Sequence, residues 1–252
     1  MRAQSASVVL PRATVAVLLP GTGSDATFAE SAFGPALQRR NIAVHPVSPD
    51  PRRVVASYLE ALDRAAERHG RILVGGISIG AAVALRWTGE QPGRVAGVLA
   101  ALPAWTGAAG DAPAALSARA TARQLRIDGL AAVTERMRAS SPAWLAETLS
   151  RSWAAQWPHL PDALDEAADY PGPTVAELRR TETPCGIAAA TDDPVHPSVV
   201  AEQWARLLPH AMSTALTLTE IGADPAALGH ACLAALDRLA PHLGAPRSDA
   251  GD

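Results

Sequence analysis

Ser78 has the sequence context of a nucleophile, because it lies at the centre of Gly76-Ile77-Ser78-Ile79-Gly80. An apolar run precedes this pentapeptide, and an alanine-rich segment without a helix breaker follows it as far as Gly89. A strand that turns directly into a helix strains its corner residue, and flanking glycines remove the side chains that would collide there. Such a corner would expose the Ser78 hydroxyl and would direct the Ile79 N–H, at the start of the helix, at a nearby oxygen.

A serine hydroxyl becomes a good nucleophile when a histidine removes its proton, and a carboxylate must orient that histidine. The carboxylate candidates are Asp192 and Asp193, which follow an apolar run ending at Ala190. The first candidate for the histidine is His230, which follows Gly229 after the last apolar run. Asp224-Pro225 is, however, a good cap and first turn for a helix containing His230, so His196 and His45 stay open as candidates, in that order.

The elements that must position these residues alternate between strand and helix. Continuous apolar runs predict buried strands at 14–19, 42–47, 72–75, 95–101, 186–190 and 213–218, with helices between them at about 27 onward, 50–70, 81–87, 198–208 and 226–243. This order predicts an α/β fold with a mostly parallel sheet flanked by helices. The alternation stops from about 105 to 183, where several helices are expected. We therefore expect a core made of 1–103 and 184–252, and a helical cap at 104–183.

These motifs together resemble the α/β-hydrolase family, and the resemblance extends over about residues 14–243. It implies that Ser78 is the nucleophile, Asp193 the acid and His230 the base. Asp193 is favoured over Asp192 because the family's acid stands just before the stretch that reads Pro-Val-x-Pro here. The resemblance also implies an oxyanion hole formed by the backbone N–H groups of Thr22 and Ile79. For the strands that open the family's sheet, residues 6–10 are the one candidate before residue 14.

Composition narrows the function further. The chain has 252 residues, 48% of them hydrophobic, a mean hydropathy of +0.06 and a net charge of -3. These values are typical of a soluble globular protein without a nucleic-acid partner or a membrane span. All 22 cationic residues are arginine, so Schiff-base chemistry and a Walker A lysine are excluded. Cys185 and Cys232 fit neither a disulfide framework nor a metal site, and we expect buried thiols in a cytoplasmic protein.

Four tryptophans in the expected cap are candidates for substrate contact: Trp105, Trp144, Trp153 and Trp157. They would line an apolar pocket above Ser78, or they would merely fix the cap to the sheet. The sequence predicts a serine hydrolase for a small-molecule ester or thioester with an apolar acyl group, needing no metal or organic cofactor. Two different functions compete with this one. The first is a binding module without catalysis, and the second is a dinucleotide-binding oxidoreductase, suggested by the glycines at 21–26.

Overall fold

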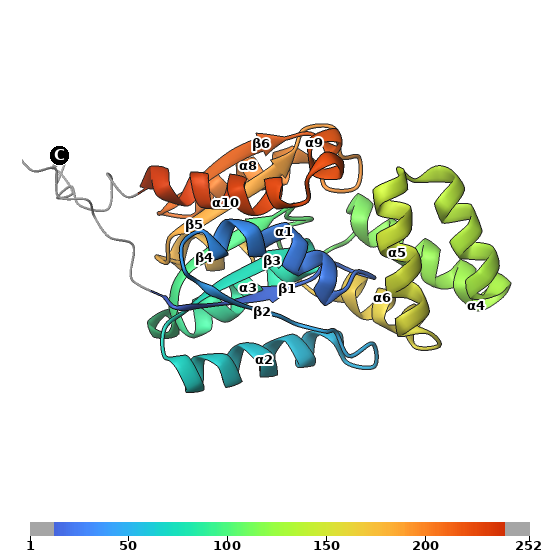
Figure 1. Ribbon diagram of the computed structural model, residues 1–252, viewed down its shortest axis with the longest axis horizontal. Coiled ribbons are helices and arrows are strands. Elements are labelled where there is room, and N and C mark those ends of the chain that lie inside the picture. The colour runs from blue at the N-terminus through green and yellow to red at the C-terminus, as the bar shows by residue number, and fades with distance from the viewer. Residues whose placement is uncertain (1–12, 240–252) are drawn as a thin grey trace, which may run out of the picture.

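The central sheet has six parallel strands in the order β2-β1-β3-β4-β5-β6 (Figure 1). The structure is a computed structural model that describes residues 13–239. The strands are β1 (Val15–Leu19), β2 (Ala43–Pro46), β3 (Ile72–Ile77), β4 (Val95–Ala101), β5 (Cys185–Ala190) and β6 (Ala211–Leu216). Every side chain of β1, β3, β4 and β5 is buried, as expected where helices cover both faces of a parallel sheet. The predicted α/β fold is therefore confirmed.

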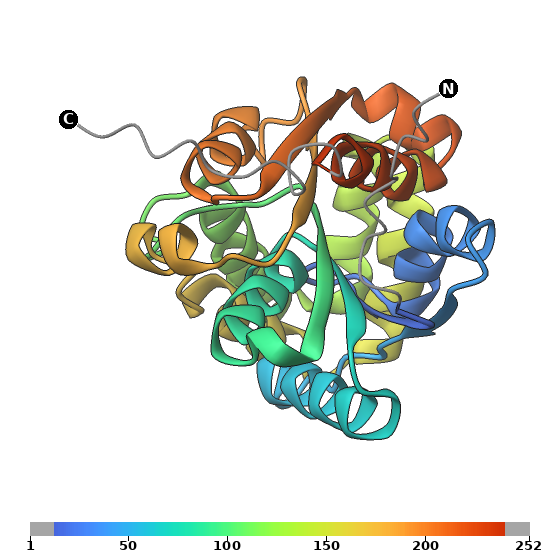
Figure 2. The same ribbon diagram turned by 90° about the vertical axis from the view of Figure 1, so that its left-hand side faces the viewer.

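Helices pack on both faces of the sheet, and the end view in Figure 2 shows them on either side of the strands. One face carries α1 (Ala26–Gln38) and α10 (Ala226–Leu239), and the other carries α2 (Val54–His69), α3 (Ile79–Glu90) and α8 (Ser198–Leu207). A short helix, η1 (Pro92–Arg94), leads into β4, and α9 (Leu218–Ala223) follows β6.

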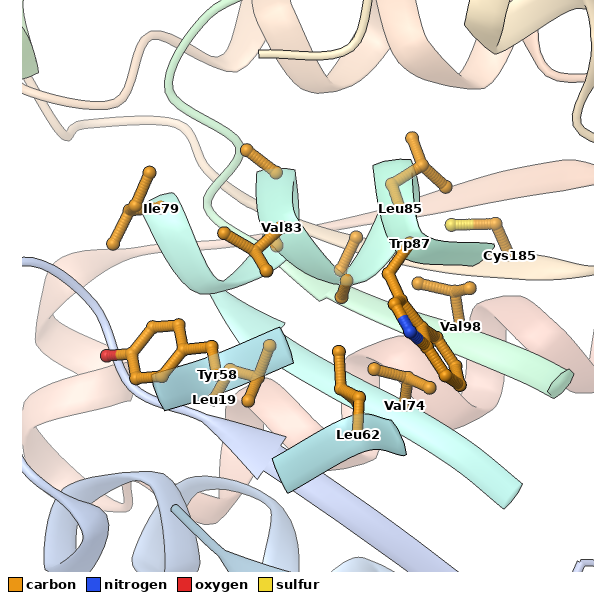
Figure 3. Close-up of a cluster of buried hydrophobic side chains, with 14 of the residues drawn as sticks. Leu19, Tyr58, Leu62, Val74, Ile79, Val83, Leu85, Trp87, Val98 and Cys185 are labelled. Atoms are coloured by element: carbon orange, nitrogen blue, oxygen red, sulfur yellow. The ribbon is translucent and has the colours of Figure 1, made fainter. Parts of the chain in front are cut away.

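The core beneath α2 and α3 fixes the start of α3. The side chains of Leu19, Tyr58, Val74, Ile79 and Val98 meet in one buried cluster between these helices and the sheet (Figure 3). In this view the hydroxyl of Tyr58 points out of the cluster, away from the other labelled side chains. The large apolar area buried here holds the β3–α3 connection in a rigid setting.

Between β4 and β5 the chain forms four helices: α4 (Pro113–Ser140), α5 (Ala143–Gln156), α6 (Leu160–Asp169) and α7 (Val175–Arg180). We call residues 104–183 the helical insertion. Figure 1 shows α4, α5 and α6 together beyond one end of the sheet. They have a core of their own that includes Leu125, Trp153 and Leu164. The first of them bends at Gly129, whose φ of 77° is outside the helical range.

Some expected boundaries differ from the structure. The helix after β2 begins at Val54 and not at Asp50, because residues 51–53 form a turn in which Asp50 accepts from the backbone N–H of Arg52 and Arg53. The last strand begins two residues earlier than predicted, at Ala211. The candidate strand at 6–10 lies outside the described residues.

The two cysteines are free and buried, as predicted. Burial raises the pKa of the Cys185 thiol to about 12 and that of Cys232 well above its usual value, so neither is a reactive thiolate. Within residues 13–239, no helix combines the length and the apolar character that crossing a membrane requires.

Candidate active site

Ser78 occupies the corner between β3 and α3 in a strained conformation, with φ 55° and ψ -115°. A positive φ is uncommon for a residue with a side chain and marks a position where the surrounding structure imposes strain. The glycines on either side permit close packing here. A Cβ on Gly76 would lie 2.3 Å from the backbone of Gly80, and a Cβ on Gly80 would lie 2.5 Å from the carbonyl oxygen of Leu19. The Gly-x-Ser-x-Gly pattern is thus required by the corner itself.

A chain of two hydrogen bonds links Ser78 to a carboxylate through His196. The Oγ of Ser78 lies 3.0 Å from Nε2 of His196, and Nδ1 of the same ring lies 2.8 Å from Oδ2 of Asp193. The Ser78 residue is 6% exposed, and the side chains of Asp193 and His196 are 8% and 17% exposed. Bulk water therefore has little access to these hydrogen bonds, which strengthens them.

Asp193 stays ionised in this setting. Burial opposes its charge, but the hydrogen bond and the electrostatic interaction with His196, together with the hydrogen bonds from the backbone N–H groups of Val195 and His196, outweigh that effect, so the pKa of Asp193 is lowered. An ionised carboxylate only accepts hydrogen bonds, so the proton of the imidazole lies on Nδ1. The Nε2 lone pair then faces the Ser78 hydroxyl, as a general base requires.

His230 does not join this group, and its expected role as the base is corrected. Asp224 caps the last helix by accepting from the backbone N–H of Ala226, so α10 begins at once and carries His230 into its second turn. There α10 packs against α1, where a Cβ on Gly229 would lie 2.6 Å from the carbonyl oxygen of Ala32. The ring that is hydrogen-bonded to Ser78 belongs to His196, the second candidate from the sequence.

Asp192 and His45, which the sequence also leaves as candidates, have other contacts. Asp192 accepts from the backbone N–H of Leu218 at 2.7 Å and so joins the loop after β5 to the start of α9. His45 lies on the edge strand β2, with its ring 5.7 Å from that of His69. The sequence signal for His196 was its place three residues after Asp193, in a loop at the carboxyl end of β5.

Thr22 lies in the loop after β1, the strand next to β3, and so at the same edge of the sheet as Ser78. Both residues line the same cavity, and Ile79 follows Ser78 as the first residue of α3. The Ser24 N–H donates to the Gly21 carbonyl at 3.0 Å, which closes a β-turn over residues 21–24. This turn places Thr22 at its second position, where the backbone N–H takes no part in the closing bond.

A cavity of about 660 Å³ opens above Ser78, between the sheet and the helical insertion. Its size suits a small organic ligand. Most of its wall is apolar, with Phe28, Leu102, Val133, Leu145, Leu149, Leu164, Leu218 and Ile221 among the lining residues. The charged side chains on it are Asp193 and Arg136, and Arg136 pairs with Asp128.

Two of the four candidate tryptophans, Trp144 and Trp153, line the cavity. The other two, Trp105 and Trp157, are not among the residues that line it. Trp105 is buried in the insertion and donates to the Tyr170 carbonyl at 3.2 Å, whereas Trp157 is 40% exposed and takes no part in the cavity wall. The sequence could not separate these cases because which side chains reach the cavity depends on how the helices of the insertion pack, and that is a property of the tertiary structure.

These groups can together activate a hydroxyl and direct it at a ligand in the cavity. Among residues 13–239, no three His, Cys, Asp or Glu side chains lie close enough together to hold a metal ion.

Comparisons with known proteins agree with this architecture. A family model described as "Alpha/beta hydrolase family" matches residues 3–243. MenH from S. aureus superposes with a TM-score of 0.67 at 16% identity, covering 91% of this chain and 96% of its own. A thermophilic esterase from Thermogutta terrifontis superposes with a TM-score of 0.64 at 17% identity, covering 90% of each chain. A search of curated protein sequences gave no significant match. Because the family match spans nearly the whole sequence, the chain belongs to the alpha/beta hydrolase family.

Proposed function

We propose that this protein is a serine hydrolase that cleaves a carboxylic ester or thioester with a small apolar acyl group. The observation that carries the proposal is the pair of hydrogen bonds from Ser78 through His196 to Asp193. A structural neighbour described as an esterase is in accord with it. We assign Ser78 as the nucleophile, His196 as the base and Asp193 as the orienting acid.

The reaction proceeds in two steps through an acyl-enzyme. Nε2 of His196 takes the proton of Ser78 as Oγ attacks the carbonyl carbon of the substrate, and Asp193 stabilises the imidazolium that forms. The bond to the leaving alcohol or thiol then breaks, and His196 donates the proton to it. A water molecule, deprotonated by His196 in turn, attacks the acyl-enzyme and releases the carboxylic acid and free Ser78.

Two backbone N–H groups, those of Thr22 and Ile79, would stabilise the oxyanion. The Ile79 N–H lies at the start of α3, where the helix dipole favours negative charge. Each such donor contributes about 3 kcal/mol to the stabilisation of the transition state in comparable sites.

The lining of the cavity supports a substrate that is apolar and uncharged on its acyl side. An anionic group there would meet the ionised Asp193, and the Arg136 guanidinium is already paired with Asp128. The leaving group is less constrained, which is why the proposal includes both esters and thioesters.

The test combines a covalent probe with turnover. A fluorophosphonate reacts with an activated serine hydroxyl, so it should label the wild-type protein and fail to label Ser78→Ala. Hydrolysis of 4-nitrophenyl esters by Ser78→Ala should fall by about a millionfold, because the three groups act as a unit. Wild-type protein that neither takes up the probe nor hydrolyses any acyl ester or thioester would contradict the proposal and favour a binding function.

A further inference from the structure

The turn that carries Thr22 depends on a glycine in a left-handed conformation. In the turn over residues 21–24, Gly23 at the third position has φ 67°. A side chain there is disfavoured by this φ, and a Cβ would lie 3.0 Å from Nε1 of Trp153. The direction of the Thr22 N–H therefore depends on how the two ends of this turn are held.

Two buried side chains hold those ends from opposite sides. The hydroxyl of Tyr58, on α2 beneath the sheet, donates to the Pro20 carbonyl at 3.1 Å. Burial raises the pKa of Tyr58, which keeps the hydroxyl protonated and able to donate. At the other end, Nε2 of Gln156, on α5 of the helical insertion, donates to the Ser24 carbonyl at 3.0 Å.

Helix α5 contacts three consecutive residues of this loop. Trp153 packs on Gly23, Gln156 bonds to Ser24, and the guanidinium of Arg151 pairs with Asp25 at 2.9 Å. Gln156 is 6% exposed, and its amide also donates to Oγ of Ser152 at 2.7 Å, which fixes the orientation of the amide. The turn is thus held by the core through one carbonyl and by the helical insertion through the other.

We propose that Gln156 is a positioning residue that, through the Ser24 carbonyl, aims the Thr22 N–H at the oxyanion. The inference rests on the proposed hydrolase function. It implies that efficient catalysis requires α5 to be packed against the loop after β1, in addition to any part α5 plays in enclosing the substrate. A small rotation of the turn would misdirect one donor of the oxyanion hole while the acyl group still binds in the cavity, and such misplacements affect the transition state more than the bound substrate.

The experiment replaces Gln156 with methionine, which has a similar volume but no N–H donor. In Gln156→Met we expect kcat on a 4-nitrophenyl ester to fall about 10- to 100-fold, with KM changed less than about twofold. The inhibition constant of a trifluoromethyl ketone, whose adduct with Ser78 carries an oxyanion, should rise by the same factor as kcat/KM falls. A side chain that only supports the fold would not produce this correlation.

Gln203→Met is the matched control. Gln203 on α8 accepts from Oγ1 of Thr106 at 2.8 Å, outside the cavity. This variant also loses a side-chain hydrogen bond, so it should show a comparable decrease in melting temperature with kcat and the inhibition constant unchanged. A fall in kcat equal to that of Gln156→Met would overturn the proposal, because the effect would then be general destabilisation.

A second variant, Tyr58→Phe, tests the turn from its other end. It should show the same loss of kcat at constant KM, and combining it with Gln156→Met should give less than the product of the two single effects, since both act on one turn. Unchanged kcat in Gln156→Met, with wild-type protein that reacts with the fluorophosphonate, would overturn the positioning role alone. Wild-type protein without esterase activity or labelling would overturn the hydrolase function and this inference together.

Discussion

At the scale of single residues, Asp193 both shapes its loop and orients the imidazole. One carboxylate oxygen accepts from the backbone N–H of Val195 at 2.8 Å, two residues further along the chain, and the other accepts from Nδ1 of His196. The first bond is the local turn that aspartate commonly makes with its own backbone. Because prolines stand at 194 and 197, the loop has few other conformations open to it. The carboxylate and the imidazole thus reach Ser78 as one short, locally organised segment.

Two histidine substitutions separate the candidates for the base. We expect His196→Gln to lower kcat/KM on a 4-nitrophenyl ester by about 10⁵-fold or more, because the Ser78 proton then has no acceptor of suitable pKa. His230→Gln should leave kcat/KM unchanged, since His230 lies in α10 and takes no part in the hydrogen-bonded chain. Steady-state kinetics of the two purified variants decides between them, and the reverse ranking would contradict the assignment of His196.

The lowered pKa of Asp193 predicts an effect on stability in acid. In the folded state the pKa of this carboxyl lies below its value of about 3.9 in the unfolded state. Between these two pKa values the unfolded state therefore binds more protons than the folded state. The stabilising contribution of this carboxyl is therefore complete above the unfolded pKa and is lost as the pH falls through the folded pKa. In Asp193→Asn, the difference in the free energy of unfolding between pH 6 and pH 3 should be smaller than in the wild type.

Urea denaturation of both proteins at the two pH values measures this difference. Asn retains an acceptor for the loop but cannot ionise, so it is the appropriate replacement. An equal loss of stability in both proteins would contradict a lowered pKa for Asp193.

The positions of Ser78 and of Asp193 at the ends of β3 and β5 could be predicted from the sequence, because glycine spacing and the turn residues before proline are local signals. The choice between His196 and His230 could not. The Asp224-Pro225 cap is a local signal that already indicated a helix containing His230, but which ring reaches Ser78 depends on the packing of α10 against α1 and on the loop after β5, which are properties of the tertiary structure. The same holds for the cavity lining, where only Trp144 and Trp153 of the four tryptophans take part.

At the scale of elements, the close approach of β3 and α3 is the feature on which the Ser78 corner depends. We expect Gly76→Ala to lower the free energy of unfolding by about 2–4 kcal/mol, because the added methyl would overlap the backbone of Gly80 and force α3 away from the strand. Urea denaturation monitored by circular dichroism provides the measurement.

Gly93→Ala is the matched control for this change, since a Cβ at residue 93 would meet nothing within 4 Å. It should leave stability unchanged or slightly increased. If the two variants proved equally stable, the tight packing at the corner would not be a requirement of the fold.

The order of strands and helices was predictable because the buried strands are continuous apolar runs. Element ends were less so: Thr27 and Glu30 have capping-box spacing, yet the residue that caps α1 is Asp25, which accepts from the backbone N–H of Phe28. Asp25 is held in place by Arg151, a contact across 126 positions that no local pattern reveals.

At the scale of the whole molecule, the apolar cavity between sheet and insertion predicts how activity depends on the substrate. Each methylene added to the acyl chain should increase kcat/KM by up to about fourfold, because burying one CH₂ group is worth about 0.8 kcal/mol. The increase should stop once the chain fills the space. A series of 4-nitrophenyl esters of increasing acyl length measures this dependence, and activity that falls steadily from acetate onward would contradict an acyl site in the cavity.

The segment after β6 contributes Leu218 and Ile221 to the cavity wall, and no histidine. We assign proton transfer to the loop after β5. On this assignment, the segment after the neighbouring strand β6 contacts the substrate but takes no part in proton transfer. Substitutions at 218 and 221 are then free to retune substrate preference during evolution or in the laboratory while the pH–rate profile stays as it was.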